Sequence, residues 1–428
     1  MSAAHPYRES VAVIGSGVAG LTAAYLLRRR YDVTLFEADD RFGGHAHTHD
    51  VRTPDGAVVP IDTGFIVHNT RTYPALCRLF AELGVRTSAA EMSLGVSCRE
   101  CGLEYAGGRN GKGLPPGGPP RVWAAYARLP AEVLRFNRDA RRLLKAGADP
   151  GVSFGEFLSP RRYSRYFVDH VALPLVAAVW SMAEDDALTQ HAWSLLSFLD
   201  NHAMLNVTGR VPWRTVVGGS REYVDRITVR DSAAHDLTAR SSTPIRAVRR
   251  HDDGVEIADA SGGRHEASKV VIATHADQAL ALLADATLAE KRVLGAFRYS
   301  RNRILLHTDT SVLPRARRAR ASWNLRKRSC QGSGPITVTY HMNRLMMLSE
   351  PLDYLVTLNN DEIDQNAVLA SAVYEHPIPD ASSFTAQRLL PELTSATTAY
   401  AGAYHGWGFH EDGCMSGVRA AAAFGVRW

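Results

Sequence analysis

The feature that most constrains the fold is a glycine-rich stretch near the start of the chain, SVAVIGSGVAGLTAAYLLRRRYDVTLFE, which begins at Ser10. Gly15, Gly17 and Gly20 stand in G-x-G-x-x-G spacing between a run typical of a buried strand and a run typical of a helix. In such a turn the first glycine permits the tight bend, the second lets the backbone approach a pyrophosphate, and the third lets the helix pack on the strand. Glu37 ends a second strand-like run 22 residues after Gly15, where a carboxylate accepts hydrogen bonds from a ribose. The stretch therefore predicts a β-α-β unit that binds an adenine dinucleotide at the helix N-terminus.

Four further stretches follow this unit in a fixed order. ADDRFGGHAHT places a glycine pair six and seven residues after Glu37. The others are VVPIDTGFIV (58–67), SKVVIATHADQA (268–279) and YAGAYHGWGFHEDGCMSGVRAAAAF (400–424). With the glycine turn, these stretches resemble the extended signature of FAD enzymes of the flavin amine oxidase and phytoene desaturase superfamily.

This resemblance implies an α/β fold with FAD as the cofactor. A discontinuous, Rossmann-like FAD-binding domain (8–90, 206–286 and 392–428) would carry an inserted α+β substrate-binding domain (91–205 and 287–391), as in glutathione-reductase-like flavoproteins of amine oxidase type. Ile245 is expected to edge the adenine, and Glu411 or Asp412 to hydrogen-bond near the flavin. The residues expected to contact FAD are Gly15, Gly17, Val18, Ala19, Gly20, Glu37, Ala38, Arg41, Gly43, Gly44, His45, Thr63, Gly64, Phe65, Ile245, Ala273, Thr274, Gly402, Glu411, Asp412, Gly413 and Met415.

The sequence resembles even more closely a bacterial group described as predicted NAD/FAD-binding, amine-oxidase-like proteins. GGHAHTHDV, DTGFIVHNTRTYP, CGLEYAG and GFHEDGCMSG all resemble that group. Its genes commonly neighbour those of cyclopropane-fatty-acid-synthase-like methyltransferases, and this association suggests lipid acyl chains as substrates.

Three functional hypotheses follow from the resemblance. The leading one is dehydrogenation, or double-bond isomerisation, of a hydrophobic fatty-acyl or isoprenoid-like substrate by hydride transfer to flavin N5. The alternatives are oxidation of a small secondary-metabolite amine, and a flavin- or lipid-binding partner without turnover. No catalytic residue is assigned, and the candidates for lining the flavin's reactive face, with packing as their alternative role, are Tyr340, His341, His405, Trp407 and His410.

The lysines bear on the choice between these hypotheses. Amine oxidases use a lysine near the flavin. The five lysines of this chain stand in loop, basic or strand-start contexts, which disfavours amine oxidation: Lys112, Lys145, Lys269, Lys291 and Lys327.

Two groups of potential metal ligands stand out. His45, His47 and His49 alternate along an expected strand and so share one side of it. Cys98 and Cys101 form a C-x-x-C in the turn of an expected hairpin, with no second pair in the chain. We predict no metal site: His45 contacts the cofactor, the other histidines are structural or line the cleft, and both cysteines are turn residues, with zinc as the alternative.

The remaining chain is assigned more coarsely. A helical block from Val122 to about Leu205 begins its second part with a Ser153-x-x-Glu156 capping box, and its wide apolar faces indicate a core or a substrate tunnel. The basic run 315–328 carries seven positive charges and is interpreted as a solvated face, or as a docking site for a phospholipid head group or an acyl carrier, with Trp323 suited to a membrane interface. The net charge of +5, without a recognition module, gives no reason to expect nucleic acid. The start of the chain lacks a signal-peptide pattern, so we expect a cytoplasmic protein, peripheral at a membrane if the basic run docks there.

Overall fold

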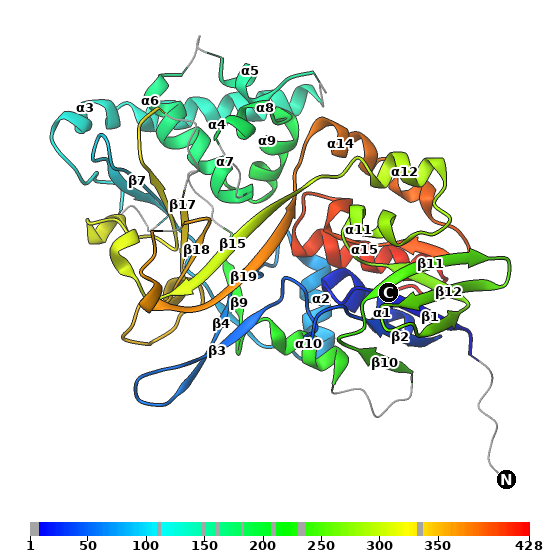
Figure 1. Ribbon diagram of the computed structural model, residues 1–428. Coiled ribbons are helices and arrows are strands. Elements are labelled where there is room, and N and C mark those ends of the chain that lie inside the picture. The colour runs from blue at the N-terminus through cyan, green and yellow to red at the C-terminus, as the bar shows by residue number, and fades with distance from the viewer. Residues whose placement is uncertain are drawn as a thin grey trace.

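The computed structural model describes residues 8–108, 113–147, 151–159, 163–180, 184–206, 211–229, 236–331, 337–360 and 362–428. Figure 1 shows two halves side by side. An α/β half lies on the right, and a second sheet with a lobe of helices above it lies on the left. The long strands β15 (Tyr299–His307) and β19 (Val368–Pro377) run diagonally between the halves.

The core of the α/β half is a parallel sheet of five strands. Its spatial order is β10 (Leu237–Arg240), β2 (Asp32–Phe36), β1 (Ser10–Ile14), β14 (Lys269–Ile272) and β20 (Thr398–Tyr400). Four of the five β1 residues are buried, as expected for a central parallel strand covered on both faces. The predicted β-α-β unit is thus confirmed, and the predicted return of 268–279 to the nucleotide-binding sheet is confirmed by β14, which pairs with β1.

Helix α1 (Val18–Leu27) lies between this sheet and the C-terminal helix α15 (His410–Ala423). Every residue of α1 is buried, because the helix is apolar all round. Glycines of α15 allow the two helices to approach closely: a Cβ atom at Gly417 would lie 2.4 Å from the Ala19 carbonyl oxygen. The amphipathic helix α2 (Pro74–Leu83) also packs here and ends at Gly84, which has a left-handed backbone conformation.

Smaller elements surround the parallel sheet. A three-stranded meander is formed by β11 (Ile245–His251), β12 (Gly254–Asp259) and β13 (Arg264–Ala267). The other small sheets are the pair β3 (Thr48–Arg52) and β4 (Val58–Asp62), and the triplet β5 (His68–Asn69), β9 (Trp213–Val216) and β6 (Thr87–Ala89). The remaining helices outside the upper lobe are α10 (Arg221–Thr228), α11 (Ala276–Leu282), α12 (Leu288–Leu294), α13 (Met342–Leu345) and α14 (Ala381–Gln387).

A seven-stranded sheet forms the base of the second half. Its order is β19, β15, β18 (Leu355–Leu358), β17 (Thr337–His341), β16 (Trp323–Lys327), β7 (Leu94–Cys98) and β8 (Glu104–Gly107). β7 and β8 form the predicted hairpin, and the pairing of β7 with β16 is the parallel exception in this otherwise antiparallel sheet. All seven strands fall within 91–205 and 287–391, and all five parallel strands fall outside these ranges; the domain boundaries themselves stay a prediction.

The helical lobe corresponds to the predicted block after Val122. Its members are α3 (Arg121–Tyr126), α4 (Leu129–Ala146), α5 (Phe154–Leu158), α6 (Arg165–Phe167), a π-helical turn (Val168–Ala172), α7 (Leu173–Trp180), α8 (Glu184–Thr189) and α9 (Ala192–Asn201). The predicted capping box of Ser153 and Glu156 is formed. Phe136, Phe154 and Phe167 are buried in the lobe's own core. No helix among the described residues is long and apolar enough to cross a membrane.

Candidate active site

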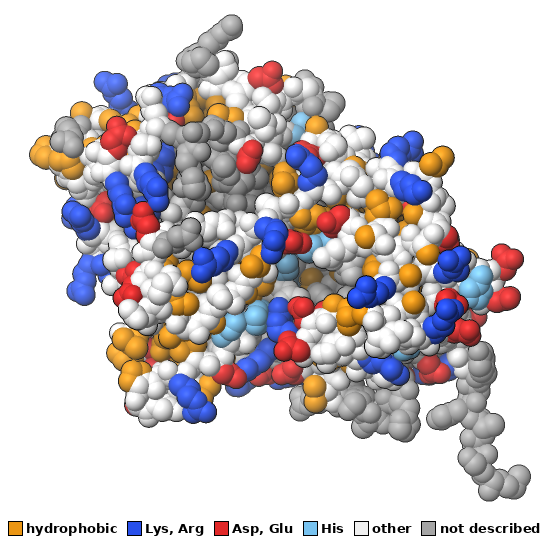
Figure 2. Space-filling model, viewed as in Figure 1, with side chains coloured by type: hydrophobic (Ala, Val, Ile, Leu, Met, Phe, Trp, Pro, Cys, Tyr) orange, Lys and Arg blue, Asp and Glu red, His pale blue; other side chains and the backbone are white. Residues whose placement is uncertain are grey.

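A single large cavity of about 1450 Å³ lies between the two halves. Figure 2 shows histidine side chains at the hollow between them. The glycine turn lines one end of the cavity, and α7, α9 and the segment before α15 line the other. Since cavities for drug-sized ligands measure about 300–1,000 Å³, this one has room for a ligand larger than an ordinary small molecule.

The glycine turn has the geometry that a pyrophosphate requires. Gly15 has a φ of +98°, and a Cβ atom there would lie 2.8 Å from the Ala273 carbonyl oxygen. A Cβ atom at Gly20 would overlap the Gly15 carbonyl oxygen, so Gly20 serves the helix–strand packing predicted for it. A Cβ atom at Gly17 would meet nothing within 4 Å, so the backbone here faces open space at the start of α1. Phosphate oxygens can therefore reach the free N–H groups of the helix.

Glu37 lines the same end and is held in place by the turn itself. The Ser16 backbone N–H donates to Glu37 Oε2 at 2.9 Å, and the Ser16 hydroxyl donates to the same oxygen. The Asp39 backbone N–H donates to Oε1 at 3.0 Å. A carboxylate offers about four acceptor positions, so Glu37 retains capacity for a ribose hydroxyl.

The glycine pair lies directly against the turn. Gly43 and Gly44 both have positive φ, +114° and +55°, and a Cβ atom at Gly44 would lie 3.1 Å from the Gly17 Cα atom. His45 follows, half-buried and facing the cavity, and its buried Nε2 has no hydrogen-bond partner in the part of the chain that the structure describes. A buried polar atom without a partner costs free energy, so Nε2 is well placed to bond with a ligand.

Aromatic and apolar side chains line the far end. Phe198 of α9 stacks on Phe409 and on His202, with ring centroids 4.5 and 3.9 Å apart. Trp407 meets Phe198 edge-on at 5.9 Å. The helical lobe also contributes Leu175, Val179 and Met204 to the wall. The helical block therefore has its own core and also lines the cavity, and its role as a substrate tunnel stays a prediction.

The histidines around the cavity are neutral at physiological pH. Burial lowers the pKa of His410 to about 3 and the pKa values of His376 and His202 to about 4. Burial also lowers the pKa of His45 well below its ordinary value, and the neighbouring histidines add to this. The cavity thus presents imidazoles as neutral hydrogen-bonding rings.

Seven of the residues expected to contact FAD do not line the cavity, and the structure gives them other positions: Gly20, Gly43, Thr63, Glu411, Asp412, Gly413 and Met415. Glu411 accepts hydrogen bonds from the Ala75 and Leu76 N–H groups at 2.9 and 3.0 Å, at the first turn of α2. Asp412 accepts from the Phe409 N–H at 2.9 Å and caps its own helix. Neither carboxylate lines the cavity and each caps a helix end, and the expectation that one of them bonds near the flavin stays a prediction.

Packing and hydrogen bonding explain why the other expected contact residues do not line the cavity. A Cβ atom at Gly413 would lie 2.6 Å from a Val18 methyl group, so this glycine serves the contact between α15 and α1. Met415 packs on the same core, and the Thr63 hydroxyl is bonded to Tyr374 at 2.7 Å. Gly43 accommodates the backbone of the glycine pair, where a Cβ atom would lie 2.6 Å from the Ala46 carbonyl oxygen. The other fifteen expected contact residues line the cavity.

Only some of the candidates for the flavin's reactive face line the cavity. Tyr340, Trp407 and His410 line the cavity, with His410 stacked on Phe65 at 3.8 Å. His341 and His405 do not line it. His341 Nε2 instead lies 3.2 Å from an Asp353 carboxylate oxygen, and His405 is buried against the Tyr404 ring.

The sequence analysis did not identify several lining residues. Tyr374 and His376 lie in the end of β19, where every residue from 372 to 377 lines the cavity. No local sequence pattern identifies this strand end as part of the site. Ser16, which holds Glu37 in place, lies inside the glycine turn but was not among the residues expected to contact FAD.

His45, His47 and His49 take different positions in the structure. His45 and His47 line the cavity, and His47 bonds to the Tyr374 hydroxyl at 3.0 Å. His49 bonds to Thr63 at 3.1 Å. Within the described residues these histidines belong to no group of three or more potential metal ligands.

The basic run is less solvated than its composition suggested. Arg326 and Arg328 both pair with Glu362, and the Lys327 ammonium is buried and donates to the Asp169 carbonyl. Trp323 lines the cavity and meets Tyr340 edge-on at 5.3 Å, which corrects its assignment to a membrane interface. Arg315 and Arg317 remain exposed, and docking of an anionic partner through this run stays a prediction.

The site fits FAD on four features already described. These are a glycine turn that faces open space, the Glu37 carboxylate held beside that turn, a buried His45 nitrogen without a partner among the described residues, and a long cavity. Comparison with known proteins agrees. The family described as "Flavin containing amine oxidoreductase" matches residues 18–331, most of the chain. The chain belongs to this family, and its cofactor is FAD. The chain spans 19%, 57% and 61% of the length of three curated relatives that it matches, so its activity is a proposal.

Individual relatives are distant. The chain is 31% identical to the tryptophan 2-monooxygenase of Allorhizobium ampelinum over 155 residues, 36% of this chain and only 19% of that protein. The structure resembles cyclohexylamine oxidase from Brevibacterium oxydans IH-35A, with a TM-score of 0.68, 15% identity and coverage of 98% and 99% of the two chains. It also resembles a conjugated-linoleic-acid-producing (CLA-producing) fatty acid isomerase from P. acnes, with a TM-score of 0.66, 15% identity and coverage of 96% and 97%. At these identities the likeness shows a shared fold.

Proposed function

We propose that the protein removes a hydride from, or shifts a double bond in, a hydrophobic substrate of fatty-acyl or isoprenoid type. FAD supplies the hydride acceptor, at its N5 atom. The chain's own residues bind and orient the substrate: apolar side chains from α7 and α9 and the wall of Trp407 and Phe409 surround it and exclude water.

The observation that carries this proposal is that the described residues place no unpaired charge at the far end of the cavity. Among the described lining residues, Glu37, Asp39 and Arg41 belong to the dinucleotide end. Glu91 is paired with Arg344 at 2.9 Å, and Glu375 with the Arg301 guanidinium at 3.6 Å. The far end therefore offers apolar surface and neutral rings, which suit an uncharged hydrocarbon segment.

A second candidate function is oxidation of an amine. Family membership and the likeness to cyclohexylamine oxidase support it. Against it, no lysine occurs among the described residues that line the cavity, although Lys112 lies outside the described ranges. The lysine expected near the flavin of an amine oxidase thus has no counterpart among the residues whose positions are known.

The test is anaerobic mixing of the yellow holoenzyme with two substrate panels. One panel contains saturated and unsaturated fatty acids and isoprenoids, and the other contains primary and secondary amines. We expect flavin bleaching, or a double-bond isomer detected by mass spectrometry, only with the lipid panel. Bleaching by an amine, with peroxide formed when air is admitted, would establish the second function instead.

A cavity-filling variant ties the result to the site. Leu175→Trp places a large ring in the far end of the cavity and should raise KM for long chains at least about 10-fold, the equivalent of 1.4 kcal/mol of lost binding. Leu134→Trp is the matched control, since Leu134 is 59% exposed and lies off the cavity. Lipid that binds without any turnover would favour a flavin- or lipid-binding partner and contradict the proposed activity.

A further inference from the structure

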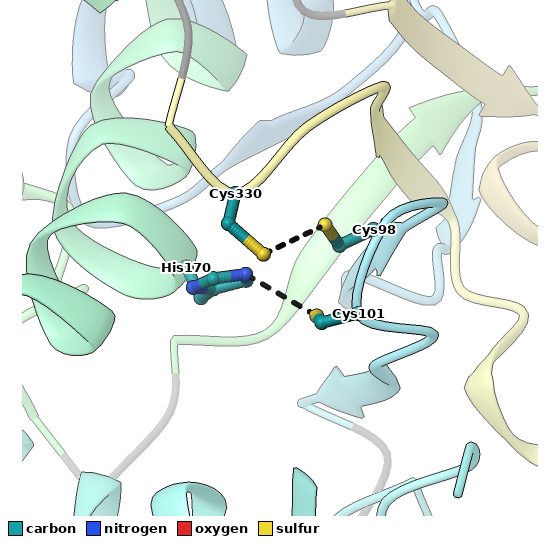
Figure 3. Close-up of side chains that lie close together, drawn as sticks. All are labelled: Cys98, Cys101, His170 and Cys330. Atoms are coloured by element: carbon teal, nitrogen blue, oxygen red, sulfur yellow. Dashed lines mark hydrogen bonds between the residues drawn. The ribbon is translucent and has the colours of Figure 1, made fainter.

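Four side chains from three separate stretches of the sequence meet outside the cavity. Cys98 and Cys101 flank the turn between β7 and β8, His170 lies in the π-helical turn before α7, and Cys330 follows β16. Their ligand atoms all lie within 4.8 Å of one another. Figure 3 shows the three sulfur atoms and the imidazole directed toward one common centre.

The separations are those of a tetrahedral metal site. Cys98 Sγ and Cys330 Sγ are 3.7 Å apart, and Cys101 Sγ is 3.6 Å from His170 Nε2. A zinc ion at about 2.3 Å from sulfur and about 2.0 Å from nitrogen gives tetrahedral edges of about 3.8 Å between two sulfur atoms and about 3.5 Å between sulfur and nitrogen. A disulfide requires about 2.05 Å between its sulfur atoms, so the cysteines are arranged as separate ligands.

We propose that Cys98, Cys101, His170 and Cys330 bind one zinc ion in a closed, structural site. Three thiolates and one imidazole complete the tetrahedral coordination of zinc and leave no position open for water or substrate. Soft thiolate ligands select zinc over magnesium or calcium. Cys98 is 2% and His170 0% exposed, which keeps the centre away from bulk solvent.

The surrounding hydrogen bonds prepare these side chains for a metal. His170 Nδ1 lies 3.0 Å from the Tyr166 carbonyl oxygen. A carbonyl can only accept, so Nδ1 carries the proton and the Nε2 lone pair faces the three sulfur atoms. On the cysteine side, the turn is closed by the Gly102 N–H, which donates to the Cys98 carbonyl at 2.9 Å, and Gly102 has the positive φ of +79° that such a turn needs.

The position of the site indicates its purpose. It joins the β7–β8 turn and the end of β16 to the π-helical turn that continues directly into α7. Leu175 and Val179 of α7 form part of the cavity wall. Zinc would therefore fasten the helical lobe to the seven-stranded sheet and fix one wall of the cavity, without taking part in the chemistry.

The sequence pattern concealed this site, and our prediction of plain turn cysteines did not anticipate it. A second C-x-x-C is the usual sign of zinc. Here the third and fourth ligands come singly, 69 and 229 positions after Cys101. Only the folded chain brings them together.

Metal analysis of the purified holoenzyme tests the proposal. After expression with added zinc and gel filtration, we expect about one tightly held zinc ion per chain, as in other closed sites. Cys101→Ser and His170→Gln should lose most of it, whereas Cys77→Ser, a half-buried cysteine on α2 outside the cluster, should keep it. FAD content, measured on the same samples, reports separately on the flavin site.

A second measurement covers variants that fail to fold. Wild-type protein grown with cobalt should show the d–d absorption of a tetrahedral thiolate site at wavelengths longer than the flavin bands. Wild-type protein without stoichiometric zinc or cobalt would overturn the proposal. So would a Cys98–Cys330 disulfide in an unreduced peptide map, or stoichiometric iron in place of zinc. None of these results depends on turnover, so they are separate from a failure of the proposed function.

Discussion

At the scale of single residues, Glu37 offers the sharpest test of the dinucleotide end. Its carboxylate is fixed by Ser16 and Asp39 and has acceptor capacity left for the ribose. Glu37→Ala removes ribose hydrogen bonds worth about 1–3 kcal/mol each, so the Kd of the apo-protein for FAD should rise at least about 10-fold. Quenching of FAD fluorescence on binding measures this Kd.

Asp40→Asn is the control for that experiment, because Asp40 is an exposed acid close by that does not line the cavity. It should leave the Kd unchanged. An equal Kd for Glu37→Ala and the wild type would mean that the ribose lies elsewhere.

Residue roles at the dinucleotide end were largely predictable, and those near the C-terminus were not. The roles of Gly15, Gly17 and Glu37 depend on a contiguous stretch, so spacing reveals them. Glu411 bonds to the N–H groups of Ala75 and Leu76, more than 330 positions away, and no local pattern shows this partner. A carboxylate next to a helix start serves a ligand or another helix equally well, and only the fold decides.

At the scale of elements, the contact between α1 and α15 supports the glycine turn. Gly417→Ala would place a methyl group 2.4 Å from the Ala19 carbonyl oxygen, which belongs to the backbone and cannot move aside cheaply. Overpacking of this kind costs about 1–3 kcal/mol. We expect a lower melting temperature and weaker FAD retention, because α1 carries the dinucleotide site at its N-terminus.

Thermal unfolding followed by flavin fluorescence measures both effects of the Gly417 change. Ala422→Ser is the control, since it adds one heavy atom on the exposed side of the same helix. If both variants melt together with the wild type, the close approach of the two helices is not needed for cofactor binding.

Elements were easier to predict than their pairing. Strand-like runs on either side of the glycine turn identified β1 and β2, and the stretch 268–279 contains β14. The parallel pairing of β7 with β16 could not be predicted, because it joins segments more than 220 positions apart. Cys98 and Cys330 are likewise more than 220 positions apart in the sequence.

At the scale of the whole molecule, the many buried histidines set the pH dependence of stability. In the unfolded chain they bind protons near their ordinary pKa of 6.5, but in the folded protein the pKa of His410 is about 3 and those of His376 and His202 are about 4. Between these values the unfolded state binds more protons. The stability contributed by these groups is therefore fully present above about pH 6.5 and is lost as the pH falls toward 4.

Two buried carboxyl groups act in the opposite direction. Burial raises the pKa values of Asp62 and Asp412 to about 6, so their contribution is present at low pH and is lost as the pH rises through 6. The histidines with lowered pKa outnumber them. We expect the melting temperature to be several degrees lower near pH 5 than near pH 7, measured by calorimetry of the holoenzyme. A melting temperature that is constant or rises toward pH 5 would show that these histidines are not buried as the structure has them.

The central claim is that one continuous cavity holds FAD over the glycine turn and an apolar substrate beside Trp407 and Phe409. Electron density from crystals of the protein, purified with whatever it retains, tests this most directly. The account predicts a dinucleotide beginning near Glu37 and Ile245, its diphosphate over Gly15 to Gly17, and elongated apolar density at the far end. A nicotinamide dinucleotide in the groove, or side chains filling it, would contradict the account.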